Sequence, residues 1–188
     1  YIRISAFKGN TPEQFQAIFD QLVQDGAKAL VFDLRDDGGG LVDALEQILD
    51  PLLPEGDIAI ATYRDGTTKT LVKSDAEECN LPMTVIVNGN TASAAELFTA
   101  SLHDFGKASI VGTQTFGKGI MQVTQTMPGG GALTLTVATY QTTKGECYHK
   151  VGITPDEIVE PGEDAIDYDN PDPEKDPQLK KAIEMVTQ

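Results

Sequence analysis

Hydrophobic and polar positions along the chain follow two alternating periods. Short, nearly continuous apolar runs predict strands that are buried on both faces, and apolar residues at every third or fourth position predict amphipathic helices between them. The expected strands cover residues 1–7, 29–34, 58–64, 67–73, 83–87, 109–112, 120–127 and 132–142, and the expected helices cover 11–26, 41–52 and 92–105 and begin again at 177. This alternation predicts an α/β fold in which helices flank a mixed β-sheet.

Local signals mark where several of these elements begin or turn. Residues 11–14, Thr-Pro-Glu-Gln, have the pattern of a capping box at the start of a helix. Asp65-Gly66 lies between two strand-like runs and predicts a hairpin. Asp176 followed by Pro177 predicts the start of a last helix. The apolar face of that helix needs a surface to dock on, and a second subunit, which would make a homodimer, is one candidate.

The composition is that of one folded domain. The 188 residues are 40% hydrophobic and 23% charged, which excludes collagen-like, coiled-coil and wholly disordered chains. A net charge of −15 disfavours nucleic acid or an anionic membrane as the principal partner, because either would repel the chain. No apolar run approaches the roughly 20 residues that cross a bilayer, and the chain opens within a strand-like run without an initiator Met, so we expect a processed or excised piece. Cys79 and Cys147 allow at most one disulfide and lack the spacing of zinc ligands.

Charge and proline content divide the chain into two parts. Residues 151–188 carry 11 acidic and three basic side chains, together with five of the ten prolines. We therefore expect a folded core over residues 1–160, followed by an acidic, proline-rich segment and a C-terminal helix over residues 161–188.

A sharp turn around Ser93 is the first candidate for chemistry. A buried strand ends at Val87, small and polar residues follow, and a helix begins at Ser93. A serine at a helix start lies next to unpaired backbone N–H groups, which can stabilise negative charge on a carbonyl oxygen that the serine attacks. Ser93 and Glu96 also fit a plain capping box, which is the more common use of such a serine.

A nucleophilic serine needs a base, and three side chains are candidates. His103 lies ten residues along the same helix, too far to reach Ser93. His149 lies in a polar loop, where a structural or solvated histidine is the more common finding. Lys118 lies between two glycines, and the strand that follows puts Lys118 and Gln122 on one face, so that Gln122 can orient the amine. A surface lysine in a glycine turn is the alternative interpretation.

A lysine accepts a proton only as the neutral amine, so a catalytic Lys118 has to be shielded from water. Its apolar neighbours Phe116, Ile120 and Met121 are expected to provide that environment. Pairs of serine and lysine are an established variant of the catalytic triad.

The third candidate is the glycine-rich loop from Asp33 to Gly40. A strand delivers this loop to the start of a helix, where exposed backbone N–H groups can bind an anion or an oxyanion. An ordinary strand-to-helix turn is the alternative, and the glycine pattern does not match a nucleotide-binding motif. Three aspartates at positions 33, 36 and 37 suggest a metal only weakly, because most such clusters form turns or are solvated, so no metal is expected.

Taken in order, these segments resemble the C-terminal processing peptidases, also called tail-specific proteases. That family has an Asp-Leu-Arg strand that runs into a glycine turn, then Asn-x-x-Thr/Ser-Ala-Ser-Ala-x-Glu, then Thr-Phe-Gly-Lys-Gly, and finally Gly-Ile-x-Pro-Asp. The corresponding residues here are 33–40, 88–96, 115–119 and 152–156. Four motifs in order, with compatible gaps, are more specific than any one of them, and the resemblance covers roughly residues 1 to 160.

The resemblance implies a crotonase-like α/β core and a serine endopeptidase that cleaves proteins near flexible C-terminal tails through an acyl-enzyme. Residues 1–160 would then be the catalytic core. Ser93 would be the nucleophile, Lys118 the general base and Gln122 the residue that positions the lysine amine. The backbone N–H groups of Ala94 and Gly39 would form the oxyanion hole. No cofactor is implied.

Two departures from the family pattern affect these expectations. The family often has Asn-Pro-Gly-Gly where this chain has Asp-Gly-Gly-Gly at residues 37–40, so the choice of donor glycine stays open and a more mobile loop is expected. The PDZ domain that usually lies upstream is absent from this sequence. The resemblance implies protein or peptide substrates with flexible tails, a PDZ domain in the full-length protein, and a membrane-tethered protein outside the cytoplasm, in the periplasm or at the cell surface.

Two alternatives belong to other functional classes. A non-catalytic module that binds a ligand or a protein can use the same crotonase-like scaffold. An acyl-CoA enzyme of the wider crotonase-like group would also use glycine-loop oxyanion donors, but the acidic charge balance disfavours its phosphate-rich ligand.

Overall fold

The computed structural model describes residues 1–75, 78–162 and 166–187 and confirms the α/β class. The helices are α1 (Thr11–Gln24), α2 (Val42–Leu49), followed by a 3₁₀ turn at Asp50–Leu52, α3 (Ala94–Asp104) and α4 (Pro177–Val186). The strands are β1 (Ile2–Arg3), β2 (Leu30–Asp33), β3 (Gly56–Tyr63), β4 (Thr68–Ser74), β5 (Met83–Val87), β6 (Ala108–Gly112), β7 (Ile120–Thr126), β8 (Ala132–Thr142) and β9 (Glu157–Ile158).

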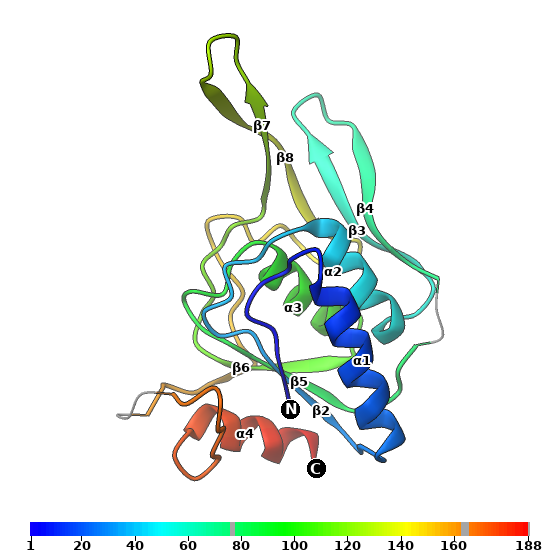
Figure 1. Ribbon diagram of the computed structural model, residues 1–188, viewed down its shortest axis with the longest axis vertical. Helices are drawn as coiled ribbons and strands as arrows, with labels where there is room; N and C mark the ends of the chain where they lie inside the picture. The colour runs from blue at the N-terminus through cyan, green and yellow to red at the C-terminus, as the bar shows by residue number, and fades with distance from the viewer. Residues whose placement is uncertain (76–77, 163–165, 188) are drawn as a thin grey trace.

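The strands of the described residues divide into two sheets instead of the single mixed sheet that we expected. One sheet is parallel, in the order β1-β2-β5-β6-β9, and the other is antiparallel, in the order β4-β3-β8-β7 (Figure 1). The hairpins β3–β4 and β7–β8 project from the body on the side away from α4. Pairing between β3 and β8 joins segments about 80 residues apart along the chain, which periodicity within a short window does not report.

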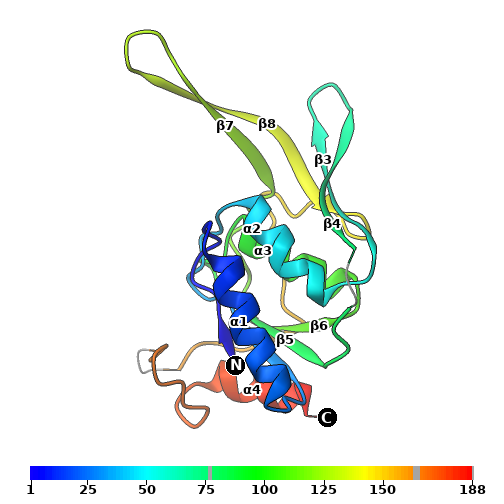
Figure 2. The ribbon, with the colours of Figure 1, turned by 45° about the vertical axis from the view of Figure 1, so that its right-hand side comes forward.

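Alternate residues of the parallel sheet enter two separate hydrophobic clusters. Leu30 and Phe32 of β2 belong to the large cluster that also contains buried residues of α1, α2 and α3. Val31, between them, belongs to a second cluster with Leu179 and Ala182 of α4. Helix α4 therefore covers the face of the sheet opposite the other three helices (Figure 2). The docking surface that the last helix needs lies within the same chain.

The helix-start signals have mixed outcomes. The carboxylate of Asp176 accepts the backbone N–H groups of Gln178 and Leu179 at 3.0 and 3.1 Å, as predicted. The predicted capping box at Thr11 is wrong, because Asn10 is the N-cap and Thr11 is already helical. The Thr11 hydroxyl instead donates to the carbonyl of Ala6 at 3.0 Å.

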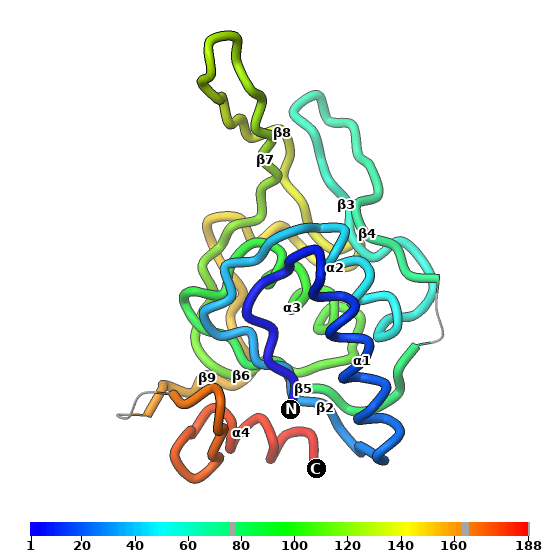
Figure 3. The backbone as a smooth tube through the Cα atoms, viewed as in Figure 1, coloured from blue at the N-terminus to red at the C-terminus, as the bar shows by residue number. Residues whose placement is uncertain are grey.

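The chain ends lie close to the parallel sheet, and the first strand is shorter than expected. Only Ile2–Arg3 pairs with β2, after which the chain leaves the sheet (Figure 3). Phe7 then forms a bridge to Gly40. Cys79 and Cys147 are free thiols. Within the described ranges, no helix has both the length and the apolar character needed to cross a membrane.

Candidate active site

Four of the five predicted site residues line one cavity of about 270 Å³. These are Ser93, Ala94, Lys118 and Gln122. The cavity lies where the start of α3 meets the start of β7, so segments from different parts of the chain meet there. The fifth predicted residue, Gly39, is not among the lining residues, and its neighbour Gly40 lines the cavity instead.

Ser93 has a backbone conformation that an ordinary helix cap does not have. Its φ is 60° and its ψ is −120°, whereas a typical N-cap lies in the β region. Such a conformation costs on the order of 1–3 kcal/mol in a residue with a side chain. The surrounding contacts therefore hold this serine in its turn, with α3 starting at the next residue, Ala94.

Glu96 joins the Ser93 turn to the Lys118 turn. Its carboxylate is fully buried and accepts the backbone N–H of Ser93 at 2.9 Å and that of Lys118 at 2.8 Å. It also accepts the Gly117 N–H at 2.6 Å and the Thr115 hydroxyl at 2.5 Å. The sequence interpretation gave Glu96 only a capping role. The sequence signal that was missed is an acidic side chain within the otherwise apolar start of α3. A buried carboxylate requires several hydrogen-bond partners, so such a residue is expected to contact other segments of the chain.

Tyr140 lies between the nucleophile candidate and the lysine turn. Its hydroxyl donates to the carbonyl oxygen of Lys118 at 2.7 Å and lies 3.4 Å from Ser93 Oγ. Burial raises the pKa of Tyr140 to about 12, so the phenol stays neutral near pH 7 and acts as a donor. No hydrogen bond joins the Lys118 amine to Ser93 Oγ among the described residues. No sequence signal had marked Tyr140 within its strand.

The surroundings of Lys118 differ in part from the prediction. Ile120 and Met121 line the cavity beside it, but Phe116 is 65% exposed and gives no shelter. Gln122 lines the cavity together with Lys118 and Ile120, the residues that regular strand alternation was expected to put on one face, and Met121 lines it as well. The register shift between Met121 and Gln122 places the extra residue in β8, because Met121 pairs with Ala138 and Gln122 pairs with Thr136.

The glycine loop lies directly against the nucleophile turn. A Cβ atom on Gly39 would lie 2.7 Å from the Ala94 nitrogen, and its φ is +93°, so only glycine fits there. The Gly39 N–H already donates to Asp37 Oδ1 at 2.7 Å. Within the described part of the chain the Gly40 N–H has no acceptor, and Gly40 lines the cavity. In this arrangement Gly40, not Gly39, offers a free donor.

Asp37 is a buried carboxyl in this loop. Its Oδ2 has no hydrogen-bond partner among the described residues. Burial raises the pKa of Asp37 to about 7. The other two aspartates of the loop have different partners, because Asp33 pairs with Arg35 and Asp36 accepts from Asn88 and Asn90. In the described ranges, no group of three or more His, Cys, Asp or Glu residues is arranged to hold a metal ion.

Neither histidine lines the cavity that contains Ser93. His103 Nε2 lies 3.1 Å from a carboxylate oxygen of Asp156. His149 packs against Gly119, where an added Cβ would lie 3.1 Å from the His149 nitrogen. The cavity therefore presents an amine and no imidazole beside the serine.

Comparison with known proteins gives a consistent family. The sequence model of peptidase family S41 matches residues 1–159. The carboxyl-terminal-processing protease of Synechocystis sp. is 35% identical over 187 residues, which are 100% of this chain and 43% of that protein. The chloroplastic C-terminal processing peptidase of Tetradesmus obliquus is 34% identical over 163 residues, which are 86% of this chain and 35% of that protein.

A solved structure supports the same grouping. A photosystem II D1 C-terminal processing protease superposes with a TM-score of 0.78 and 33% identity, over 84% of this chain and 41% of that one. The chain thus spans less than half the length of each of these relatives.

Proposed function

The chain belongs to peptidase family S41, and from this premise we propose that it is the catalytic core of a serine endopeptidase that cleaves proteins near flexible C-terminal tails. The observation that carries the proposal is the shared cavity in which Ser93 and Lys118 lie, with Glu96 bonded to the backbone of both turns. A buried carboxylate that joins a strained serine to a lysine turn is costly, and fold stability alone does not require it.

In the proposed reaction, Ser93 Oγ attacks the scissile carbonyl and its proton passes to the neutral amine of Lys118. The tetrahedral intermediate expels the amine of the C-terminal fragment, which takes that proton and leaves an acyl-enzyme on Ser93. Water then hydrolyses the ester, with Lys118 again accepting and returning a proton. No cofactor takes part in these steps.

The oxyanion would be held by backbone N–H groups. One donor is Ala94, the first residue of α3, where the helix dipole adds to the stabilisation. The second donor is Gly40 in the arrangement described above, because the Gly39 N–H is held by Asp37. Gly39 itself becomes a donor only if it exchanges Asp37 for the oxyanion.

The lysine needs to approach Ser93 more closely than it does in this arrangement. Tyr140 lies next to Ser93 Oγ, and rotation of the Lys118 side chain within the cavity is the simplest route to contact. Gln122 lines the same cavity and is the proposed residue that then holds the amine.

A non-catalytic binding module on the same scaffold is the second candidate. It is favoured by one observation, that the Gly39 donor is engaged and the serine and the lysine are not hydrogen-bonded. A serine-reactive β-lactone probe, whose ring opens to leave an ester on the serine, separates the two. An active protease is acylated at Ser93 and loses labelling in Ser93→Ala, whereas the exposed control Ser5→Ala labels fully. An unlabelled, folded wild-type chain refutes the protease.

The wider context of the protein is also a proposal. We infer that residues 1–160 form the catalytic core, of crotonase-like type, and that residues 161–188 support it. In the full-length protein we expect an upstream PDZ domain, protein substrates with flexible tails, and a membrane-tethered location outside the cytoplasm. A homodimer is a further proposal, although Leu179 and Ala182 of α4, the helix on which it was expected to rest, pack against the parallel sheet of the same chain.

A further inference from the structure

The C-terminal segment contacts the loops that carry the candidate site. Tyr168 lies beyond residues 1–159, the part that the family model matches, and its hydroxyl donates to Asp36 Oδ2 at 2.7 Å. Asp36 belongs to the glycine loop and has a φ of +61°, which is unusual for a residue other than glycine. The contact therefore joins the tail to a loop position that is itself conformationally restrained.

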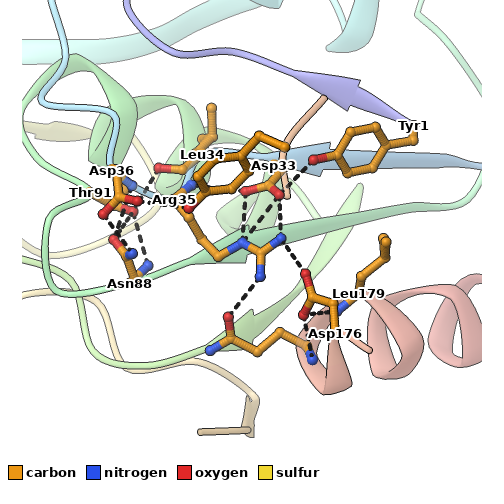
Figure 4. Close-up of polar contacts among 11 residues, drawn as sticks. Tyr1, Asp33, Leu34, Arg35, Asp36, Asn88, Thr91, Asp176 and Leu179 are labelled. Atoms are coloured by element: carbon orange, nitrogen blue, oxygen red, sulfur yellow. Dashed lines mark hydrogen bonds and ion pairs between the residues drawn. The ribbon is translucent and has the colours of Figure 1, made fainter. Parts of the chain in front are cut away.

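Asp36 holds the turn that precedes the nucleophile. Its Oδ1 accepts the side-chain amides of Asn88 at 3.0 Å and Asn90 at 2.8 Å. Its own backbone N–H donates to Asn88 Oδ1 at 3.1 Å (Figure 4). The side chain thus connects the glycine loop to the turn that leads into Ser93.

Two further hydrogen bonds carry this connection toward the site. The Thr91 hydroxyl donates to the carbonyl of Leu34 at 2.8 Å. The Ala92 N–H donates to the Asp37 carbonyl at 2.9 Å. Since the next residue is Ser93, a displacement of Asp36 is passed to both the nucleophile and the oxyanion loop.

The ring of Tyr168 is fixed from the core by two arginines. The Arg3 guanidinium lies 3.8 Å from the ring centroid, and that of Arg35 lies 5.5 Å away. Arg35 is in turn paired with Asp176, the N-cap of α4, at 2.7 Å. Its Nη1 also donates to Gln178 of α4 at 3.0 Å. Arg35, which lies in the glycine loop two residues after β2 ends, therefore contacts both Tyr168 and the start of α4.

We propose that Tyr168 is a positioning residue, and that its contact with Asp36, here called the latch, sets the glycine loop against the Ser93 turn. The inference rests on the proposed function, because it assigns the C-terminal segment a part in acylation of Ser93. Tyr168 touches no reacting atom and acts only through Asp36. The hydrogen bond to a carboxylate is of the stronger, charge-assisted kind.

The test compares Tyr168→Phe with Tyr1→Phe in the 188-residue chain. Each change removes one phenol-to-carboxylate hydrogen bond of 2.7 Å, but Tyr1 donates to Asp33, which among the described residues has no hydrogen bond to the Asn88 turn. Hydrogen exchange of the amides of residues 36–40 and 88–93 reports on the latch directly. The rate at which the β-lactone probe acylates Ser93 reports on the consequence of the latch for reactivity.

In Tyr168→Phe we expect exchange in both turns to rise, and the acylation rate to fall, each by about tenfold. Tyr1→Phe should change neither. In an Asp36→Asn background, which replaces Oδ2 by an amide, the same Tyr168→Phe change should have a much smaller effect on both quantities.

Each other result is decisive. Unchanged exchange in Tyr168→Phe overturns the latch, whether or not Ser93 reacts. Faster exchange with an unchanged acylation rate shows a contact that only maintains the fold, and overturns the positioning role. If the wild-type chain is not acylated at all, the proposed function fails, and the exchange result alone then decides whether the latch exists.

Discussion

The carboxylate of Glu96 accepts the backbone N–H of Lys118 at 2.8 Å, across 22 residues of sequence. The same oxygen accepts the N–H of Ser93 at 2.9 Å. The turn that carries the nucleophile candidate and the turn that carries the base candidate are therefore bonded to one atom, and their separation does not depend on the sheet alone.

Glu96→Gln should lower both stability and activity. The glutamine amide would direct an NH₂ group at backbone donors, so we expect a loss of about 2–4 kcal/mol in the free energy of unfolding, measured by urea denaturation. Glu13→Gln is the matched control, because it makes the same change in the first turn of α1 on an exposed residue. A Glu96→Gln protein as stable as that control would contradict the role of Glu96.

Ser93→Ala and Lys118→Ala should each reduce cleavage of an unstructured protein tail by at least about a thousandfold. Circular dichroism should show an unchanged fold, because both side chains are only half-buried and the capping contact of the Ser93 hydroxyl with the Glu96 N–H is worth only about 1 kcal/mol. Gln122→Ala should cost about tenfold or less, since it acts only by orienting the amine. The exposed Lys28→Ala serves as the control, and substantial turnover by either of the first two variants would disprove the dyad.

The Asp37→Asn variant should become more stable relative to the wild type as the pH rises. Burial raises the pKa of Asp37 to about 7, so the folded chain binds this proton more tightly than the unfolded chain does. The wild type therefore loses stability as the pH rises from about 4 to about 7, whereas the asparagine variant does not lose this contribution. The advantage of the variant should grow by roughly 2–4 kcal/mol between pH 4 and pH 8, measured by denaturation at each pH.

Asp65→Asn provides a control of opposite sign. Hydrogen bonds from the Thr67 side chain and backbone lower the pKa of Asp65, so its contribution to stability is present above pH 4 and is lost as the pH falls. That variant should be the less stable protein at pH 8. A flat difference between Asp37→Asn and wild type across the pH range would contradict the raised pKa of Asp37.

Gly39→Ala should abolish acylation of Ser93 and destabilise the chain. The new Cβ would lie 2.7 Å from both the Ala92 oxygen and the Ala94 nitrogen, and the backbone conformation is one that alanine disfavours. Gly38→Ala is the neighbouring control, because a Cβ there meets nothing within 4 Å. We expect Gly38→Ala to change the free energy of unfolding by less than about 1 kcal/mol. Equal melting temperatures for the two variants would show that the close approach at Gly39 does not exclude a Cβ atom.

The elements that were predicted correctly have strong local patterns. The apolar run of β2 and the 3.6-residue period of α1 need no information from elsewhere in the chain. The division into two sheets was missed because it depends on which strands pair, and β9, with two residues, is too short to leave a pattern. Asp176 was identified as a cap because aspartate before proline is a local signal.

At the site, residue types could be predicted but contacts could not. Ser93 and Lys118 were selected from their turns and from the family resemblance, and the structure brings both to one cavity. Tyr140 reaches them through pairing between β3 and β8, which residue spacing does not show, whereas Gln122 lines the cavity with Lys118 and Ile120 as the strand alternation predicted. The engagement of the Gly39 N–H by Asp37 depends on a side-chain rotamer, which a sequence does not specify.

The assignment of neighbouring β2 residues to opposite hydrophobic clusters has a practical consequence for engineering. Val31 and Leu179 can be repacked as a pair without changing the side chains that support α3, so substitutions there should combine additively with substitutions near Ser93. The underside of the sheet is thus a region in which the thermal tolerance of the chain can be adjusted without substituting a residue that lines the cavity.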